Sequence, residues 1–148
     1  MRLAFFLLLI ATTSHAQELA PGDATLLGMQ LGKSTVQDVL SRFGLAPLRQ
    51  GDVDEICYRS ESPLEATWVL FGAGERGDWE TLTQFRVMSA PPADITCRPT
   101  TLIPPGAPTD SGVRLGMPED EIKPRLGRLV RATIAEGRVS SYEIRLSE

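Results

Sequence analysis

The chain has 148 residues, 42% of them hydrophobic, and a formal net charge of −4. This size and composition are those of one globular domain rather than of a disordered or membrane-embedded chain. The mildly acidic balance includes no basic stripe, so neither nucleic acid nor an anionic membrane surface is an expected partner.

Residues 1–16 have the three parts of a secretory signal peptide. A single basic residue, Arg2, is followed by nine apolar residues at 3–11, and two small residues, Ser14 and Ala16, come last. A transmembrane helix needs roughly 20 apolar residues, so this run is too short to span a bilayer. The pattern therefore predicts export of the chain rather than membrane insertion.

Cleavage is expected between Ala16 and Gln17, which leaves a chain of residues 17–148 in the periplasm or outside the cell. Once Arg2 is removed, this single domain carries 14 basic and 19 acidic side chains. No cysteine lies at the cleavage site and no second long apolar run follows, so neither a lipid anchor nor a transmembrane segment is expected.

The two cysteines, Cys57 and Cys97, are expected to pair. In an oxidising compartment an even number of cysteines usually forms disulfides. A redox-active pair is the alternative, but the two residues lack the Cys-x-x-Cys spacing of such sites. We therefore predict a structural bridge.

The first helix is predicted over residues 34–43. Apolar residues recur there at helical spacing: Val36, Val39, Leu40 and Phe43. Ser34 and Gln37 fit a capping box at its start, and Gly44 follows a basic last turn.

Three strands are predicted next, over 54–60, 66–72 and 81–89, as an antiparallel meander. The middle run is continuously apolar, which favours a strand covered on both sides. In the third run, Thr83, Phe85 and Val87 alternate with Leu82, Gln84, Arg86 and Met88. With the helix covering one face, these strands complete a first helix–sheet unit at 25–90.

Residues 91–111 are rich in proline and show little periodicity. A flexible linker is the usual reading of such a composition. Cys97 lies within it, however, and a bridge to Cys57 would hold its first half beside the first strand. We therefore predict an ordered, extended strap.

The last segment, 112–148, reads as a second unit that begins with a short helix. Pro118 suits the first helical position and the acidic residues after it complement the helix dipole, but Pro124 removes a helical hydrogen bond. A short or kinked helix is expected, followed by a hairpin of 129–134 and 138–146.

The two helix signals repeat each other. With a one-residue gap, 31–44 and 115–127 share Leu-Gly, a helix cap, an apolar face and a terminal glycine. The sequence thus predicts an α+β fold, an amphipathic helix packed on an antiparallel sheet, with a second, shortened helix plus β-hairpin repeat. The matching residues are Leu31, Gly32, Ser34, Val36, Val39, Leu40, Phe43 and Gly44, then Leu115, Gly116, Met117, Ile122, Leu126 and Gly127.

On these residues the chain resembles the superfamily that contains the outer-membrane assembly lipoprotein BamE (SmpA/OmlA) and the β-lactamase inhibitory protein BLIP. The acylated cysteine of the lipoproteins is missing here, and the second unit is shorter than an inhibitor half-domain. The resemblance implies a non-catalytic binding module, an assembly accessory or an inhibitor, whose partner is another envelope or secreted protein.

The only histidine, His15, leaves with the signal peptide. The exported chain then lacks the usual general base, the histidine-dependent nucleophile systems and the commonest transition-metal ligand. With both cysteines paired, no thiolate is left for a zinc site. We expect no catalytic residue, no metal and no cofactor.

A carboxylate-based hydrolase acting on cell-wall or glycan substrates is the alternative. Two acidic clusters would have to supply its acid and base: Asp52, Asp54 and Glu55, and Glu119, Asp120 and Glu121. Both also fit a solvated face or a helix start. An enzyme would place two carboxylates across a cleft, a binding module would present a broad apolar or aromatic sheet face, and a purely structural envelope component is a third class.

Aromatic residues beside polar ones are the candidate partner contacts. Trp79 stands between Asp78 and Glu80 next to a predicted loop, and Tyr58 lies in the first predicted strand. Trp68 has apolar neighbours and is expected in the core.

Overall fold

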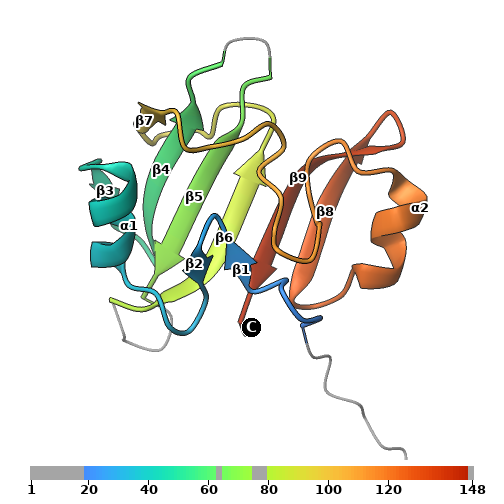
Figure 1. Ribbon diagram of the computed structural model, residues 1–148, viewed down its shortest axis with the longest axis horizontal. Coiled ribbons are helices and arrows are strands. Elements are labelled where there is room, and N and C mark those ends of the chain that lie inside the picture. Colours follow the sequence, from blue (N-terminus) through green and yellow to red (C-terminus); the bar gives the residue numbers. More distant parts are fainter. Residues whose placement is uncertain (1–18, 63–64, 75–79, 147–148) are drawn as a thin grey trace, which may run out of the picture.

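The computed structural model describes residues 19–62, 65–74 and 80–146, and strands dominate it (Figure 1). The elements are β1 (Thr25–Leu26), β2 (Met29–Gln30), α1 (Val36–Phe43), β3 (Leu48–Arg49), β4 (Asp54–Ser60), β5 (Trp68–Ala73), β6 (Leu82–Met88), β7 (Cys97–Thr100), α2 (Glu119–Ile122) with a 3-10 turn at Lys123–Arg125, β8 (Val130–Ala135) and β9 (Arg138–Arg145). The expected signal peptide and its cleavage site lie outside the described residues.

Seven strands form one sheet in the order β3-β4-β5-β6-β9-β8, and β7 pairs with β4. The β4–β7 pairing is parallel and the others are antiparallel. The predicted meander is therefore present as β4-β5-β6, and the predicted C-terminal hairpin is present as β8–β9. The hairpin joins the meander through β9 beside β6, so both predicted units share a single sheet.

The core lies on one face of this sheet, but a helix covers only part of that face. Helix α1 lies at the β4 end, while the β1–β2 hairpin and the segment between β7 and α2 lie in front of the remaining strands (Figure 1). The buried residues of these irregular segments are Leu26, Met29, Leu31, Ile103, Ala107, Val113 and Met117. The prediction of a helix packed on a sheet is thus correct only in part, because two short helices cannot cover seven strands.

Helix α1 begins two residues later than predicted. Thr35, not Ser34, is the N-cap, and it exchanges capping-box hydrogen bonds with Asp38. Ser34 instead accepts a hydrogen bond from the Gln30 amide at 2.8 Å. The helix buries Val39 and Phe43, and the Phe43 ring lies 5.4 Å from that of Phe71 on β5.

Because of a β-bulge, the predicted face of Leu82 in β6 is wrong. The register between β5 and β6 shifts between Gly72 and Ala73, so Ala73 faces Leu82 while Gly72 faces Gln84. A bulge adds one residue to one strand and reverses the alternation beyond it. Leu82 therefore joins Phe85 and Val87 in the core, although strict alternation placed it on the opposite face.

Two contacts anchor the predicted strap. Its first half contains β7, whose Cys97 is bonded to Cys57 on β4 with the Cα atoms 4.5 Å apart. Its second half receives a hydrogen bond from the buried Tyr142 hydroxyl, which donates to the Ala107 carbonyl. Both contacts tie the strap to strands that the sheet fixes.

The repeated Leu-Gly segments enter the sheet in the same way. The Gly32 amide bonds the Leu82 carbonyl, the Leu82 amide bonds the Ser34 carbonyl, and the Val36 amide bonds the Glu80 carbonyl. The second copy makes the same three bonds around the start of β9. The Gly116 amide bonds the Val139 carbonyl, the Val139 amide bonds the Met117 carbonyl, and the Glu119 amide bonds the Gly137 carbonyl. Gly32 and Gly116 have φ of 79° and 76°, a conformation that glycine adopts at little cost.

The second helix is short, as Pro124 predicts. Four α-helical residues follow Pro118 and a 3-10 turn then contains Pro124. No helix among residues 19–62, 65–74 and 80–146 has the length and apolar character needed to cross a bilayer.

Removal of the disulfide should lower the free energy of unfolding. The bridge closes a separation of 40 residues, for which loop-closure entropy gives about 4 kcal/mol as an upper expectation. We expect the Cys57→Ser/Cys97→Ser variant to lose about 2–4 kcal/mol in urea unfolding. Reductant should destabilise the native chain by a similar amount and leave the variant unchanged; equal stability of the two chains without reductant would contradict the assignment.

Tyr142 should make stability fall at alkaline pH. Burial raises the pKa of Tyr142 above its ordinary 10.0, so its hydroxyl stays protonated in the folded chain where the unfolded chain ionises. Its contribution is full below pH 10 and declines as the pH rises toward the raised folded pKa, by about 1.4 kcal/mol per pH unit.

The Tyr142→Phe variant separates this effect from packing. At about pH 8 it should be less stable by about 1 kcal/mol, because the hydrogen bond to Ala107 is lost. Above pH 10 its stability should fall less steeply than that of the native chain. Parallel stability curves from about pH 9 to about pH 11.5, measured by urea unfolding, would contradict this prediction.

Candidate functional site

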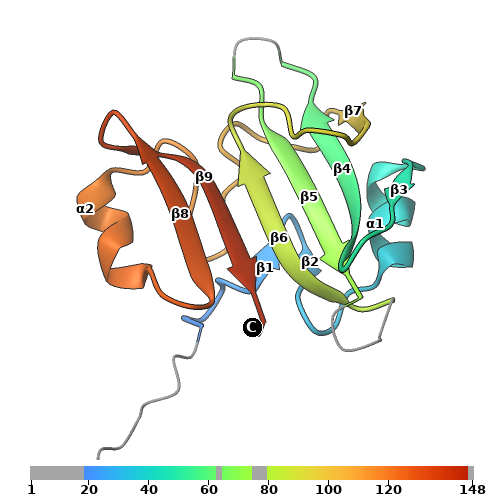
Figure 2. The ribbon, with the colours of Figure 1, turned by 180° about the vertical axis from the view of Figure 1, so that it is seen from behind.

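The sheet face opposite the core carries a group of charged side chains, and we call it the charged face. Its charged and polar members come from four strands, β3, β4, β6 and β9: Arg49, Glu55, Gln84, Arg86, Glu143 and Arg145. They share one face because side chains of a strand alternate and paired residues project together. Seen from behind, the strands are not covered by a helix, and the chain between β6 and β7 crosses them near one end (Figure 2).

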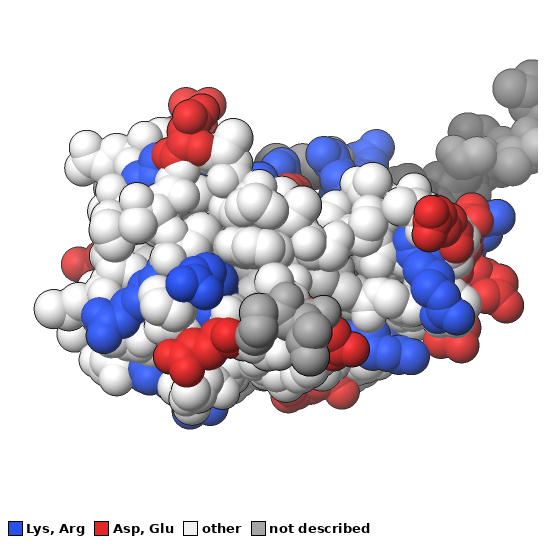
Figure 3. Space-filling model, turned by 90° about the horizontal axis from the view of Figure 1, so that it is seen from above, with Lys and Arg blue, Asp and Glu red and all other residues white. Residues whose placement is uncertain are grey.

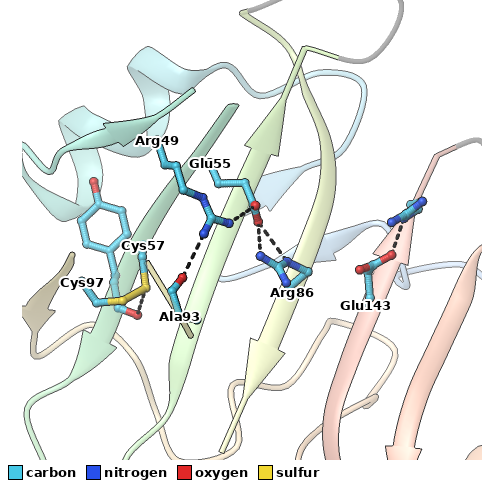
Figure 4. Close-up of polar contacts among 9 residues, drawn as sticks. Arg49, Glu55, Cys57, Arg86, Ala93, Cys97 and Glu143 are labelled. Carbon is cyan, nitrogen blue, oxygen red and sulfur yellow. Dashed lines mark hydrogen bonds and ion pairs between the residues drawn. A yellow bond between two sulfur atoms is a disulfide. The ribbon is translucent and has the colours of Figure 1, made fainter. Parts of the chain in front are cut away.

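Glu55 is the centre of the charged face. Its Oε1 accepts from Arg49 Nη2 at 2.5 Å, and its Oε2 accepts from Arg86 Nε at 2.9 Å and Nη2 at 2.6 Å. Arg49 also donates to the Ala93 carbonyl at 3.0 Å, which links the crossing segment to this network (Figure 4). The Glu55 side chain is only 9% exposed, so two arginines, one on the adjacent β3 and one on β6 beyond β5, compensate one buried carboxylate.

A second ion pair lies on the other side of Arg86. Glu143 on β9 accepts a hydrogen bond from Arg145 Nε and lies directly opposite Arg86 in the β6–β9 register. Charges of alternating sign therefore run across the sheet from Arg49 to Arg145. In the end-on view of Figure 3, too, acidic and basic side chains are interspersed rather than gathered by sign.

A shallow hollow of about 380 Å³ opens among these residues. Glu55, Gln84, Arg86 and Glu143 line it, together with Asp52 and Val53, which directly precede β4. A neighbouring hollow of about 190 Å³ between β6, β9 and β8 shares Arg86 and Glu143. The charged face thus offers two adjoining depressions with a common wall.

Gln84 is the one member whose polar group is unsatisfied. Its Oε1 is buried and has no hydrogen-bond partner among the described residues, while the side chain lies over Gly72. A Cβ at position 72 would lie 2.5 Å from Gln84 Cγ, so the glycine makes room for this side chain. A buried carbonyl oxygen without a partner costs free energy, so a donor that reaches it from the hollow would bind favourably.

A further buried ion pair holds the start of the described chain. Asp23 accepts from Arg125 Nη2 and from the Ser111 hydroxyl, and Arg125 also donates to the Ser111 carbonyl at 3.1 Å. These contacts join the lead-in, the strap and the turn after α2. The network is local to the packing of three segments and therefore has a structural role.

The predicted partner-binding aromatics are not part of the charged face. Tyr58 is fully buried; its hydroxyl donates to the Gly44 carbonyl at 2.6 Å and its ring lies 5.2 Å from that of Phe43. Burial also raises the pKa of Tyr58, against a smaller opposing effect of Arg98. Tyr58 is thus a core residue, and Trp79 lies outside the described residues.

The two acidic clusters have different surroundings. Glu55 lies in the charged face, whereas the Glu119 carboxylate pairs with Lys123 at 3.3 Å on the exposed side of α2. Within the described part of the chain, no group of three or more acidic, histidine or cysteine side chains is arranged to hold a metal ion. The sequence placed Gln84 and Arg86 on one strand face together with Leu82 and Met88, but the cross-strand register that brings Arg49, Glu55 and Arg145 beside them cannot be derived from single strands.

Comparisons of the chain with protein-family models, with curated proteins and with solved structures find no match. The charged face therefore has to be interpreted from its own geometry.

Glu55→Gln should destabilise the chain more than the matched change Glu143→Gln. The first leaves Arg49 and Arg86 facing each other over a buried neutral amide, and we expect a loss of about 1–3 kcal/mol. Glu143 is more exposed, and its ion pair with Arg145 is partly solvated, so its loss should cost under about 1 kcal/mol. Urea unfolding at neutral pH measures both, and equal losses would show that Glu55 is not the centre of the network.

Proposed function

We propose that this chain is an exported, non-catalytic protein-binding module of the bacterial envelope or secretome, acting as an assembly accessory or an inhibitor. The observation that carries the proposal is the charged face, an uncovered sheet surface on which alternating charges are held in place by ion pairs. Arginine is enriched at protein interfaces, and fixed charges of both signs give register and specificity to a docking surface.

Three further features agree with this proposal. The disulfide is typical of proteins from oxidising compartments, and the N-terminal sequence has the pattern of a signal peptide. The repeated Leu-Gly helix segments are the basis of the likeness to the BamE and BLIP superfamily, which is itself part of the proposal. The surface differs from the broad apolar or aromatic face expected from sequence, because Tyr58, Phe71 and Phe85 face the core. Trp68, which was expected in the core, is half-buried and lies on the side of the charged face, opposite Met88 in the β5–β6 register.

A carboxylate hydrolase remains the second candidate because Glu55 and Glu143 line the same hollow. General acid–base catalysis requires a carboxyl that can exchange a proton with substrate. Both Glu55 oxygens already accept hydrogen bonds from arginine, and Glu143 accepts one from Arg145. These ion pairs favour binding over catalysis as the role of the two carboxylates.

A photo-crosslinking experiment in the exporting bacterium tests the proposal. A benzoylphenylalanine at Asp52, which is exposed and lines the hollow, should give a discrete protein adduct. The same group at Lys123, exposed on the turn after α2, is the matched control and should not. In a chain that also carries Arg86→Glu, the adduct at position 52 should be lost, because the charge between Glu55 and Glu143 is reversed.

Two outcomes would contradict the proposal. In the first, positions 52 and 123 give the same adducts, or neither position gives any. The other is turnover of a wall or glycan substrate that Glu55→Gln and Glu143→Gln each abolish while the chain stays folded by circular dichroism.

A further inference from the structure

The two halves of the sheet are related by an approximate twofold axis between β6 and β9. Leu82 and Val139 make the same pair of bonds to their Leu-Gly segments, so 84–88 of β6 corresponds to 141–145 of β9. The register agrees with this correspondence: Phe85 pairs with Ile144, and Val87 pairs with Tyr142. Exchanging the two strands reproduces the same pairs.

The correspondence extends to the next strands outward, β5 and β8. Phe71 and Gly72 pair with Phe85 and Gln84, and a bulge follows before Ala73 pairs with Leu82. On the other side Ala132 and Thr133 pair with Tyr142 and Ser141, and a bulge follows before Ile134 pairs with Val139. Because the bulge recurs at the same step, β8 is the counterpart of β5.

The second half has no counterpart of β4. In the first half β4 pairs with the outer edge of β5, with Ile56 opposite Phe71 and Tyr58 opposite Val69. In the second half β8 is the last strand of the sheet, and no described strand pairs with its outer edge. The edge that receives β4 in one half is therefore left without a strand in the other.

Hydrogen bonding shows which groups of β8 face outward. The Arg145 amide on β9 bonds the Leu129 carbonyl. In an antiparallel pair every second residue bonds the partner strand, so 129, 131 and 133 bond β9. Residues 130, 132 and 134 therefore direct their backbone amides and carbonyls away from β9, to the outer edge. Val130 uses its outward carbonyl to accept from the Gly127 amide. Ala132, half-buried at the middle of the strand, directs its amide and carbonyl to the edge.

We propose that the outer edge of β8 binds an extended segment of a partner polypeptide, which adds to the sheet as an antiparallel strand. The missing counterpart of β4 defines this occupant. Every second side chain of this segment would be apolar and would point to the core side of the sheet. Leu126 and Ile134 lie on that side of the second half, as Ile56 and Tyr58 do in the first half. Backbone hydrogen bonds to Ala132 give such strand addition its affinity. This inference rests on the proposed protein-binding function and names a second surface for it.

A peptide taken from this chain is the most direct probe. It reproduces residues 52–62 with Cys57→Ser, because β4 is the strand whose counterpart is missing. Titrated into the exported, disulfide-bonded chain labelled with nitrogen-15, it should shift amide signals of 130–134. It should also slow hydrogen exchange at the Ala132 amide at least about tenfold, since that amide becomes bonded.

Two N-methylated peptides provide matched controls. Residues 56, 58 and 60 of β4 direct their amides to β5, as the Ser60 amide bond to the Thr67 carbonyl shows. A methyl on the amide at position 56, which would face the Ala132 carbonyl as Ile56 faces Phe71, should therefore abolish binding, whereas a methyl at position 57, which faces away, should preserve it. The protein variant Ala132→Pro should remove the interaction in the same way, since edge strands tolerate proline.

Three results would overturn the proposal: no shifts at a peptide concentration on the order of 1 mM, equal binding of both methylated peptides, or shifts confined to the charged face. Self-association through β8 in the absence of peptide would also overturn it, because the occupant would then be a second copy. Since the charged face is tested separately by crosslinking, failure at β8 leaves that proposal standing, whereas failure of the protein-binding function removes the basis of both.

Discussion

The pairing of β6 with β9 is the interaction on which the rest of the molecule depends. It is the junction through which the two halves of the chain form one sheet, and its register decides what each face carries. Phe85, Val87, Tyr142 and Ile144 project together into the core, whereas Arg86 and Glu143 project to the charged face. A slip by one residue would place the charged side chains in the core, so the hydrophobic face fixes the register strongly.

This sheet needs a second layer, and the chain provides it mostly from segments without regular structure. These segments make backbone hydrogen bonds among themselves, such as Leu31 to Ala24 and Asp110 to Thr25, and individual side-chain anchors attach them to the sheet. The disulfide fixes the first half of the strap, the Tyr142 hydroxyl its second half, and Asp23 with Arg125 holds the lead-in against it. Few anchors replace the continuous packing that a long helix would give.

The parts of this fold that follow from periodicity were predictable, and the parts that follow from register were not. Strand β4 has the predicted bounds, and both helices and the C-terminal hairpin appear where their patterns indicate. The cap of α1, the bulge before Ala73 and the β1–β2 hairpin were missed because each depends on one or two residues in a particular tertiary setting. The charged face was missed for the same reason: its members are far apart in sequence, and only strand pairing brings them together.

The approximate symmetry also explains why the two halves carry opposite charges where β6 and β9 meet on the charged face. Arg86 and Glu143 occupy equivalent positions and lie opposite each other beside the twofold axis. An identical charged residue in both halves would place like charges together in a pair whose side chains are close, which destabilises a sheet. Opposite charges turn the same contact into an attraction, and Arg86 is then able to join Glu55 on one side and face Glu143 on the other. The alternating charge pattern therefore follows from the pairing of two equivalent strands, β6 and β9, whose equivalent positions lie opposite each other and need charges of opposite sign.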